Sequence, residues 1–237
     1  MPEPSAEGKL RKRLKPLDNA GLESGELLIH EIYASIQGES TRAGRPCTFV
    51  RTTACHLRCT YCDTPHAFGQ GTRMHRDAVA AQVQELGMPL VEITGGEPLL
   101  QREVGPLMRE LCDAGFEVML ETSGALSIAE LDPRIICIMD LKTPSSGEVE
   151  ANLWENLDHL KPSDEVKFVV GSREDFEWAT RVLREQRLHE RCTVLMGPVF
   201  GAVPPADLVD WILAEKLPVR FQLQLHKFIW DPNARGV

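Results

Sequence analysis

Short apolar segments alternate with amphipathic segments along most of the chain. The apolar segments are predicted to be strands, at residues 27–36, 47–53, 89–94, 116–121, 135–140, 165–170, 192–196 and 219–225. The amphipathic segments are predicted to be helices, at residues 76–86, 101–114, about 150–159, 173–187 and 204–214. Strands that alternate with helices indicate parallel βα units, so the pattern predicts an α/β fold, an incomplete (β/α) barrel of parallel strands.

One of these predicted helices, residues 101–114, shows its periodicity clearly. Its apolar residues share one face: Val104, Leu107, Met108, Leu111 and Cys112. Gly115 follows and suits the C-terminal cap. Cys112 is therefore expected in the core. Cys137 and Cys192 lie inside apolar strands and are expected there too, because a free cysteine packs as a small hydrophobic residue.

Composition narrows the class of protein. Of 237 residues, 43% are hydrophobic and 26% charged, which allows a well-filled core in a single domain, predicted over residues 25–237. The formal net charge of −9 provides no chain-wide basic surface, so no nucleic-acid partner is expected. Residues 1–24 are polar, with several basic residues, and are predicted to be a flexible N-terminal tail.

The expected cellular location depends on membrane spans, a signal peptide and disulfides, none of which the sequence indicates. No apolar run approaches the length of a membrane span, and no signal peptide is visible, so no membrane partner is expected and the cytoplasm is the default. The seven cysteines are odd in number and clustered, which does not resemble a secreted disulfide framework.

The carboxyl ends of the predicted strands draw attention, because functional groups collect there in barrels of parallel strands. The segments that follow the strands include ACHLRC at 54–59, GGEP at 95–98, TSG at 122–124 and LKTPSSG at 141–147.

Three of the cysteines, Cys55, Cys59 and Cys62, have the spacing C-x3-C-x2-C. A structural zinc site usually has four ligands in two pairs, and here His56 and His66 would have to complete it. A redox pair would leave Cys55 unexplained, and the expected compartment disfavours a disulfide. A cubane iron–sulfur cluster ligated by three thiolates would leave one iron open, as a catalytic site requires.

The cysteine spacing, with Tyr61 before the last cysteine, resembles the radical S-adenosylmethionine superfamily, and ITGGEPLL at 93–100 resembles its GGEP motif. The resemblance implies a [4Fe–4S] cluster on the three cysteines, with S-adenosylmethionine bound to the open iron. One electron then cleaves a C–S bond, and a 5′-deoxyadenosyl radical abstracts a hydrogen atom from the substrate. The residues expected to bind S-adenosylmethionine are Tyr61, Asp63, Gly95, Gly96, Glu97, Ser123 and Lys142.

Outside these motifs, the chain resembles the 7-carboxy-7-deazaguanine synthase family from about residue 28 to residue 230. The resemblance lies in SIQGESTRAGRPCTFVRTTACHLRC at 35–59, CDTPHAF at 62–68 and QLQLHKFIW at 222–230. It implies conversion of 6-carboxy-5,6,7,8-tetrahydropterin to 7-carboxy-7-deazaguanine with loss of ammonia, on the path to queuosine and related 7-deazapurines. It also implies Mg²⁺, an electron donor such as a flavodoxin or ferredoxin, and a homodimer.

A pterin presents a donor–acceptor edge and a carboxylate. Gln37 and Glu39 suit the edge, and the planar fork of Arg51 suits the carboxylate. The full set expected to bind substrate is Ile36, Gln37, Gly38, Glu39, Arg51, Thr94 and His226. Thr64 matches the position that ligates Mg²⁺ in the family, and magnesium takes few protein ligands. On the last predicted strand, a polar face of Arg220, Gln222, Gln224 and His226 is expected to close the site.

One residue departs from the family pattern, since Ser40 stands where glycine is usual. A side chain at this position restricts positive φ. Two other functions remain open from the sequence. A glycyl-radical-enzyme activase shares the cysteine spacing and the compact size but acts on a protein. A non-enzymatic zinc or iron–sulfur module would have a closed ligand shell and no use for the GGEP loop.

Overall fold

The computed structural model describes residues 21–237. The predicted tail, residues 1–24, falls mostly outside this range, because residues 1–20 are not among the described residues. None of the helices within residues 21–237 is both long enough and apolar enough to cross a membrane.

A nine-stranded sheet forms the centre of the described chain, in the order β3-β1-β2-β4-β5-β6-β7-β8-β9. Neighbouring strands are parallel from β2 through β4 to β9 in this order. Strand β1 runs antiparallel to its two neighbours, β2 and β3. The strands are β1 (Glu26–Ile36), β2 (Pro46–Thr52), β3 (Thr72–His75), β4 (Leu90–Gly95), β5 (Glu117–Thr122), β6 (Ile136–Asp140), β7 (Glu165–Val170), β8 (Thr193–Pro198) and β9 (Arg220–Phe221).

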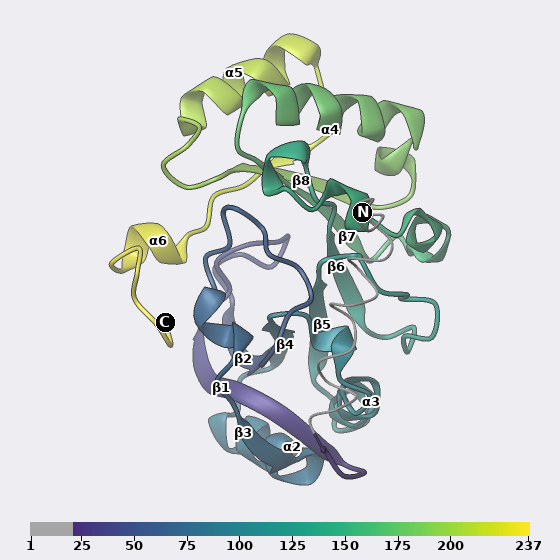
Figure 1. Cartoon of the computed structure of the whole chain (residues 1–237), viewed down its shortest axis with the longest axis vertical. Coiled ribbons are helices and arrows are strands. Elements are labelled where there is room, and N and C mark those ends of the chain that lie inside the picture. Colours follow the sequence, from purple (N-terminus) through teal and green to yellow (C-terminus); the bar gives the residue numbers. More distant parts are fainter. Residues whose placement is uncertain (1–20) are drawn as a thin grey trace, which may run out of the picture.

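Helices cover the outer face of this curved sheet. In Figure 1, α2 and α3 lie at one end of the molecule and α4 and α5 at the other. The α-helices are α2 (Arg76–Leu86), α3 (Val104–Asp113), α4 (Arg173–Glu185), α5 (Pro205–Glu215) and α6 (His226–Ile229). Two buried apolar clusters join the helices to the sheet, one under α2 and α3 and the other under α4 and α5. The fold is therefore the expected incomplete α/β barrel.

The period of two along each strand separates this outer core from the inner face. Val50, Ile93 and Leu120 point outward into the cluster under α2 and α3. Phe49 and Met119 point inward and form a smaller apolar layer with their neighbours. We call the space on the inner side of the sheet the lumen. Charged residues occupy other inward positions, such as Glu121 in β5 and Lys167 in β7.

The core cysteines and the helix cap were predicted correctly. Cys137 and Cys192 are buried in the cluster under α4 and α5, and Cys112 packs against the other one. Gly115 has φ +92° beyond the end of α3, where its N–H donates to the carbonyl of Cys112.

Three predicted elements differ from the structure for identifiable reasons. Helix α3 begins at Val104 instead of residue 101, because the side chain of Gln101 binds the backbone of Leu28 through both its oxygen and its nitrogen and holds Gln101 extended. The helix predicted near 150–159 is two short 3₁₀ helices, Val149–Ala151 and Trp154–His159.

In that second region, buried asparagines bond to neighbouring backbone. Asn152 bonds to both backbone polar groups of Lys142, and Asn156 donates to the carbonyls of Gly124 and Leu126. Such bonds compete with helix formation. The last strand is also shorter than predicted, since β9 ends at Phe221. Strand β3, which pairs with the start of β1, was not predicted.

Candidate functional site

The loop between β1 and β2, residues 37–45, crosses the amino ends of the parallel strands, and we call it the floor loop. Thr41 donates its backbone N–H to Glu165 at the start of β7, 3.2 Å away. Arg42 donates to Glu117 at the start of β5 (3.1 Å) and also to Glu165. These contacts fix the floor loop across one end of the lumen.

Gln37 and Glu39 reach from the floor loop toward the strands. The Gln37 amide nitrogen donates to the Glu92 carboxyl group on β4, and its amide oxygen accepts from the Glu39 N–H at 3.0 Å. Both ends of this buried side chain therefore have partners inside the protein. Binding of substrate by Gln37 stays a prediction, and its amide would have to exchange a partner to do so.

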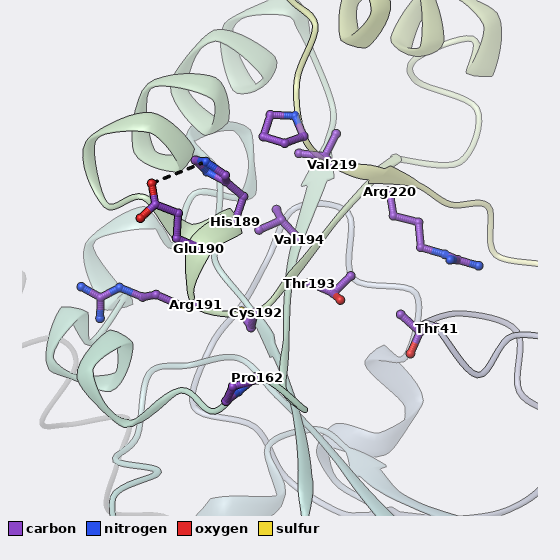
Figure 2. Close-up of a pocket in the computed structure, with 11 residues that line it drawn as sticks. Thr41, Pro162, His189, Glu190, Arg191, Cys192, Thr193, Val194, Val219 and Arg220 are labelled. Atoms are coloured by element: carbon purple, nitrogen blue, oxygen red, sulfur yellow. Dashed lines mark ion pairs between the residues drawn. The ribbon is translucent and has the colours of Figure 1, made fainter.

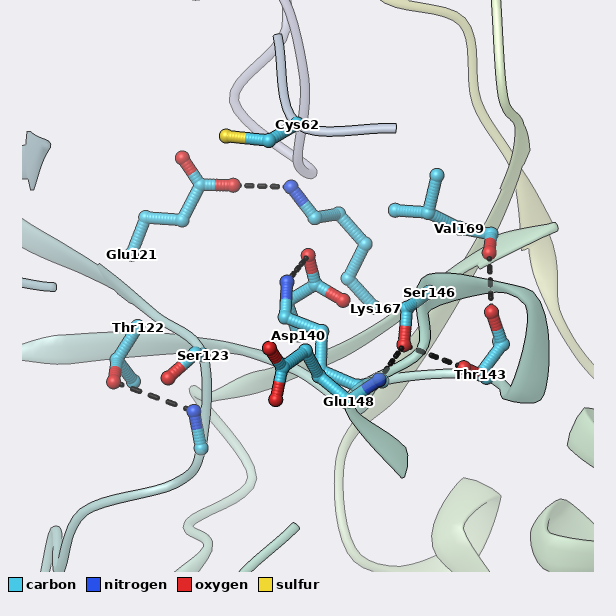
Figure 3. Close-up of polar contacts among 12 residues, drawn as sticks. Cys62, Glu121, Thr122, Ser123, Asp140, Thr143, Ser146, Glu148, Lys167 and Val169 are labelled. Atoms are coloured by element: carbon cyan, nitrogen blue, oxygen red, sulfur yellow. Dashed lines mark hydrogen bonds and ion pairs between the residues drawn. The ribbon is translucent and has the colours of Figure 1, made fainter. Parts of the chain in front are cut away.

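A lysine from the sheet ties the floor loop to the neighbouring strands. Lys167 of β7 is nearly fully buried and forms ion pairs with Glu39 (3.1 Å) and with Glu121 of β5. Thr94 of β4 donates to the other oxygen of Glu121 at 3.1 Å. Figure 3 shows Glu121 and Lys167 facing one another. Thr94 and Glu39, both predicted substrate residues, thus belong to one connected network.

This network shifts the pKa values of two carboxyl groups, Glu92 and Glu121, in opposite directions. Burial, followed by the negative charge of Glu121, raises the pKa of Glu92 well above its usual range. Burial also works to raise the pKa of Glu121, but the ammonium group of Lys167 outweighs it and lowers this pKa. The lumen therefore holds two carboxyl groups whose pKa values are shifted in opposite directions, a pairing typical of acid–base sites.

The segment after β9 lies against the floor loop and spans the open side of the barrel. Gln222 accepts from the N–H of Ser40, and Gln224 donates to both Glu39 and Asp63. The predicted strand continues only to Phe221, yet the polar residues after it do contact the site.

His226 begins α6 instead of ending a strand. A Cβ atom placed on Gly38 would lie 2.5 Å from its Nδ1, so this close approach requires glycine. Asp63 forms an ion pair with Lys227 at 3.1 Å. Although burial opposes it, Lys227 holds the pKa of Asp63 at about 2.

Residues 55–62, which we call the cysteine loop, follow β2 at the carboxyl end of the strands. All three cysteines are half-buried, and Cys55 and Cys59 pack against a small apolar cluster that includes Leu57 and Ala125. Burial raises the pKa of the Cys55 thiol to about 12, but a metal-bound thiol is deprotonated outright.

The arrangement of the three thiols fits a cluster better than a single ion. A tetrahedral zinc ion with Zn–S bonds of about 2.3 Å needs its sulfurs within roughly 4 Å of one another. Within residues 21–237, the metal-ligand groups that come within 4.8 Å of each other in threes do not include these cysteines. Three separated thiolates on one loop suit the larger iron–sulfur core.

The two glycines at the end of β4 hold the start of this loop by close backbone contact. A Cβ atom on Gly96 would lie 2.1 Å from the carbonyl oxygen of Ala54, and one on Gly95 would lie 2.3 Å from that of Thr52. The Glu97 N–H donates to the Ala54 carbonyl at 2.8 Å. The two glycines are therefore required for the GGEP segment to pack against the start of the cysteine loop.

Two other residues expected near S-adenosylmethionine, Ser123 and Lys142, lie at the next strand ends, just after β5 and β6. The buried Glu97 carboxylate accepts from the backbone N–H of Ser123 (2.8 Å) and from its hydroxyl (2.5 Å). Lys142 pairs with Asp140 at 2.8 Å. Burial would lower the pKa of Lys142, but the Asp140 carboxylate reverses this and raises it. The Tyr61 hydroxyl lies 3.4 Å from that of Thr143.

Arg51 lies near the end of β2 on the inner face, but its fork is already engaged. Its Nε donates to Glu31 at 2.8 Å, and one terminal nitrogen donates to the hydroxyl of Tyr33 at 2.9 Å. Both partners come from β1. Arg51 is therefore rigidly held beside the lumen, and carboxylate binding by it stays a prediction.

Thr64 and Ile36 complete the predicted residues. The Thr64 hydroxyl lies 3.9 Å from the sulfur of Cys62, at the start of a 3₁₀ helix, Pro65–Phe68. Ile36 is the last residue of β1, just before the floor loop.

A pocket of about 490 Å³ lies elsewhere, at the amino ends of β8 and β9. Figure 2 shows its lining, which includes His189, Arg191, Thr193 and Arg220. Catalytic groups of such barrels gather at the opposite, carboxyl ends, so this open pocket is not the site.

Sequence reasoning missed four residues of the lumen: Glu92, Glu121, Asp140 and Lys167. Each is a charged residue at an inward position of a strand, and in β4 and β6 it is the single charged residue. A buried strand with a single charged residue is unusual, and that signal could have identified Glu92 and Asp140.

Sequence comparisons with known proteins agree with the family resemblance of the motifs. A family model of the Radical SAM superfamily matches residues 49–139. A protein of Koribacter versatilis named 7-carboxy-7-deazaguanine synthase is 45% identical, over 88% of this chain and 99% of its own length. A protein of Chlorobaculum tepidum with the same name is 47% identical, over 89% of this chain and 97% of its own.

Solved structures agree on the fold. QueE from Escherichia coli superposes with a TM-score of 0.71 at 22% identity, covering 85% of this chain and 95% of the other. SuiB from Streptococcus suis, bound to its precursor peptide SuiA, gives a TM-score of 0.55 at 13% identity, covering 73% of this chain and 47% of the other.

Proposed function

Because the chain belongs to the 7-carboxy-7-deazaguanine synthase family of radical S-adenosylmethionine enzymes, we propose that it converts 6-carboxy-5,6,7,8-tetrahydropterin to 7-carboxy-7-deazaguanine with loss of ammonia. The observation that carries the proposal is the lumen itself. It has three thiols at one end, a polar floor loop at the other, and between them carboxyl groups whose pKa values are shifted in opposite directions. A purely structural metal site has no use for such a set of inward-facing charged groups.

The cofactors have a clear place in this proposal. A [4Fe–4S] cluster and S-adenosylmethionine, when bound, supply one-electron cleavage of a C–S bond and the hydrogen abstraction that follows. Cys55, Cys59 and Cys62 would hold the cluster. Gly95, Gly96, Glu97, Tyr61, Asp63, Ser123 and Lys142 would surround S-adenosylmethionine. The Glu97–Ser123 and Asp140–Lys142 contacts support this, because they fix polar groups at adjacent strand ends.

Residues of the floor loop and the strands would hold the pterin. Glu39 and the backbone of Ile36–Gly38 would face its amino-bearing edge, with Thr94 and His226 beside them. Arg51, oriented by Glu31 and Tyr33, would accept the carboxylate. These two contacts keep the guanidinium group in one orientation, which lowers the cost of binding.

Proton transfer falls to the two carboxyl groups. Loss of ammonia requires a proton on the leaving nitrogen, and Glu92 is the better proton donor of the two because its pKa is raised. Glu121, with its pKa lowered by Lys167, would accept a proton from the substrate. The two environments assign the acid and the base in the way that neighbouring carboxyl groups do in other enzymes.

We include Mg²⁺ in the proposal, with the Thr64 hydroxyl as its protein ligand. Magnesium keeps waters and substrate oxygens in its shell, so a single hydroxyl at the mouth of the lumen suffices. We also propose one domain over residues 25–237, a homodimer, a flavodoxin or ferredoxin as electron donor, and a cytoplasmic location.

Anaerobic reconstitution tests the function. The protein is loaded with iron and sulfide, mixed with S-adenosylmethionine, Mg²⁺, a reductant and 6-carboxytetrahydropterin, and the products are followed by mass spectrometry. We expect 7-carboxy-7-deazaguanine. Cys59→Ala should abolish both cluster iron and product, whereas Cys112→Ala, a cysteine in the core under α3, should retain both.

The outcomes separate the levels of the proposal. If S-adenosylmethionine is cleaved but the pterin is unchanged, the substrate assignment and the roles of Glu39 and Arg51 are wrong. If no cluster forms and nothing is cleaved, the three thiols need another explanation. A reaction without Mg²⁺ tests whether the enzyme needs this ion. An unchanged rate would mean that Thr64 has no role as a magnesium ligand.

A further inference from the structure

Two histidines and a glutamate meet beside the lumen, apart from the cysteine loop and the charged network. His30 and Glu31 belong to β1, and His66 belongs to the 3₁₀ helix that follows the cysteine loop. Each offers one ligand atom, and these three atoms all lie within 4.8 Å of one another. The two imidazole rings are 5.1 Å apart between centroids and tilted by 51°. No function described above uses either histidine.

An irregularity in β1 explains how two adjacent residues come to the same place. The pairing with β2 runs from Ile29 opposite Thr52 to Glu31 opposite Arg51, so His30 is an extra residue in the ladder. In a regular strand, neighbouring side chains point to opposite faces. A bulge breaks that alternation and re-aims a side chain, and bulges are frequent next to functional sites.

Both β1 residues also have the hydrogen-bonded support that metal ligands usually have. The Nδ1 of His30 lies 2.6 Å from the carbonyl oxygen of Gln70. A carbonyl only accepts, so Nδ1 carries the proton and Nε2 presents its lone pair. The Glu31 carboxylate accepts from Arg51 at 2.8 Å through one oxygen, which fixes its orientation and leaves the other oxygen.

We propose that His30, Glu31 and His66 bind one divalent transition-metal ion of the zinc class. Two imidazoles and one carboxylate are a ligand set of catalytic zinc sites and of non-haem iron sites, which keep further positions open. The site is distinct from the magnesium site proposed at Thr64, because Mg²⁺ prefers oxygen ligands throughout. It does not depend on the proposed function, since it involves neither cluster nor pterin.

The position of the site matters for the rest of the protein. Glu31 is shared between the proposed ion and Arg51, so the ion would lie one side chain away from the guanidinium group. An ion on the Glu31 carboxylate withdraws negative charge from that ion pair. Binding of the ion would therefore weaken the ion pair that orients Arg51 on the inner face of β2.

Zinc binding to the reconstituted holoenzyme tests the proposal. Loading the cluster first keeps zinc off the cysteines, and excess Mg²⁺ fills oxygen-only sites. The protein is dialysed against Zn²⁺, bound zinc is counted per chain by mass spectrometry, and the zinc environment is measured by X-ray absorption. We expect one zinc per chain with nitrogen and oxygen ligands at about 2.0–2.2 Å and no sulfur.

Three variants complete the experiment. His30→Ala and His66→Ala should each weaken zinc binding by roughly tenfold or more while keeping full cluster iron, which reports that the variant is folded. The control is His189→Ala, whose ring lies 3.9 Å from the Glu190 carboxylate, a similar pairing far from β1. A native protein that retains no zinc, sulfur in the zinc shell, or histidine variants that bind like the native protein would each overturn the proposal.

Discussion

The cysteine loop and the floor loop lie at opposite ends of one lumen, and different interactions hold them. The start of the cysteine loop is held mainly by close backbone packing: the Gly96 N–H donates to the Thr52 carbonyl just before the loop, and a Cβ at Gly96 would collide with Ala54. The floor loop is fixed by charged and amide side chains from distant strands, such as Lys167 and Gln224. The position of the cysteine loop depends mainly on close backbone packing at its start, whereas the position of the floor loop depends on charged and polar side chains.

This difference teaches which change each end can tolerate. Close backbone contact at a glycine is broken by any side chain, charged or not, because the added Cβ atom already collides. A buried ionic network withstands changes of shape but not the loss of one charge, because the partner is left buried and unpaired. The floor loop is therefore the place where isosteric substitutions are informative.

The largest effect is expected for Lys167→Met, which keeps most of the volume and removes the charge. The half-buried carboxylates Glu39 and Glu121 would lose their ion pair, and we expect the free energy of unfolding to fall by about 3 kcal/mol, the lower end of the range for a buried pair. Denaturant unfolding of the anaerobic protein measures it. Adding Glu121→Gln should recover part of the loss.

A surface pair provides the control for that measurement. Arg187 and Glu190 are joined by two hydrogen bonds, of 3.0 and 2.6 Å, but both are exposed. Arg187→Met should cost less than about 1 kcal/mol. If the two methionine variants lose the same stability, the floor loop is not held by its buried charges and the contrast with the cysteine loop fails.

A smaller effect, dependent on pH, is expected at Glu92. Its pKa is 4.5 in a model compound and is raised in the folded protein, so above that pH the unfolded chain releases a proton that the folded protein keeps. Stability therefore falls as the pH rises from about 4.5 toward the folded pKa. Glu92→Gln removes this dependence and still accepts from Gln37.

Melting temperatures measured anaerobically across the pH range check this expectation. The native protein and Glu92→Gln should be similar in stability near pH 4.5, and the variant should gain roughly 1 kcal/mol or more toward neutral pH. Glu92→Leu, which cannot accept from Gln37, should be less stable than Glu92→Gln. Parallel pH curves for the native protein and Glu92→Gln would mean that Glu92 is ionised in the folded state.

The same contrast explains how much the sequence could predict. Residues 76–86 and 165–170 were predicted with their exact bounds, because their periodicity and flanking residues are local properties. The cysteine loop was identified for the same reason, since its three ligands lie within eight positions of one another.

The floor loop shows what a local pattern cannot provide. Lys167 and Glu39 are separated by 128 residues, and only the order and register of the strands bring them together. Gln222 and Gln224 were predicted to lie on a strand face, but their contacts with the floor loop replace the ladder beyond Phe221. The bulge at His30 likewise depends on its pairing with β2.

The smallest expected effect concerns Ser40, where the family pattern has glycine. The residue is buried with φ +66°, a conformation that costs a side chain about 1–2 kcal/mol. Its hydroxyl accepts from the Arg42 N–H at 2.9 Å and compensates for part of that cost. Ser40→Ala keeps the strain and loses the bond, so it should destabilise by about 1 kcal/mol.

Ser40→Gly loses the same bond but relieves the strain, and it should stay within about 1 kcal/mol of the native protein. Denaturant unfolding of the two variants side by side separates strain from hydrogen bonding. Equal stability of Ser40→Ala and the native protein would show that the hydroxyl contributes nothing. In that case the floor loop is held at this point by Gln222 alone, through its bond to the Ser40 N–H, and its geometry does not depend on which small residue occupies position 40.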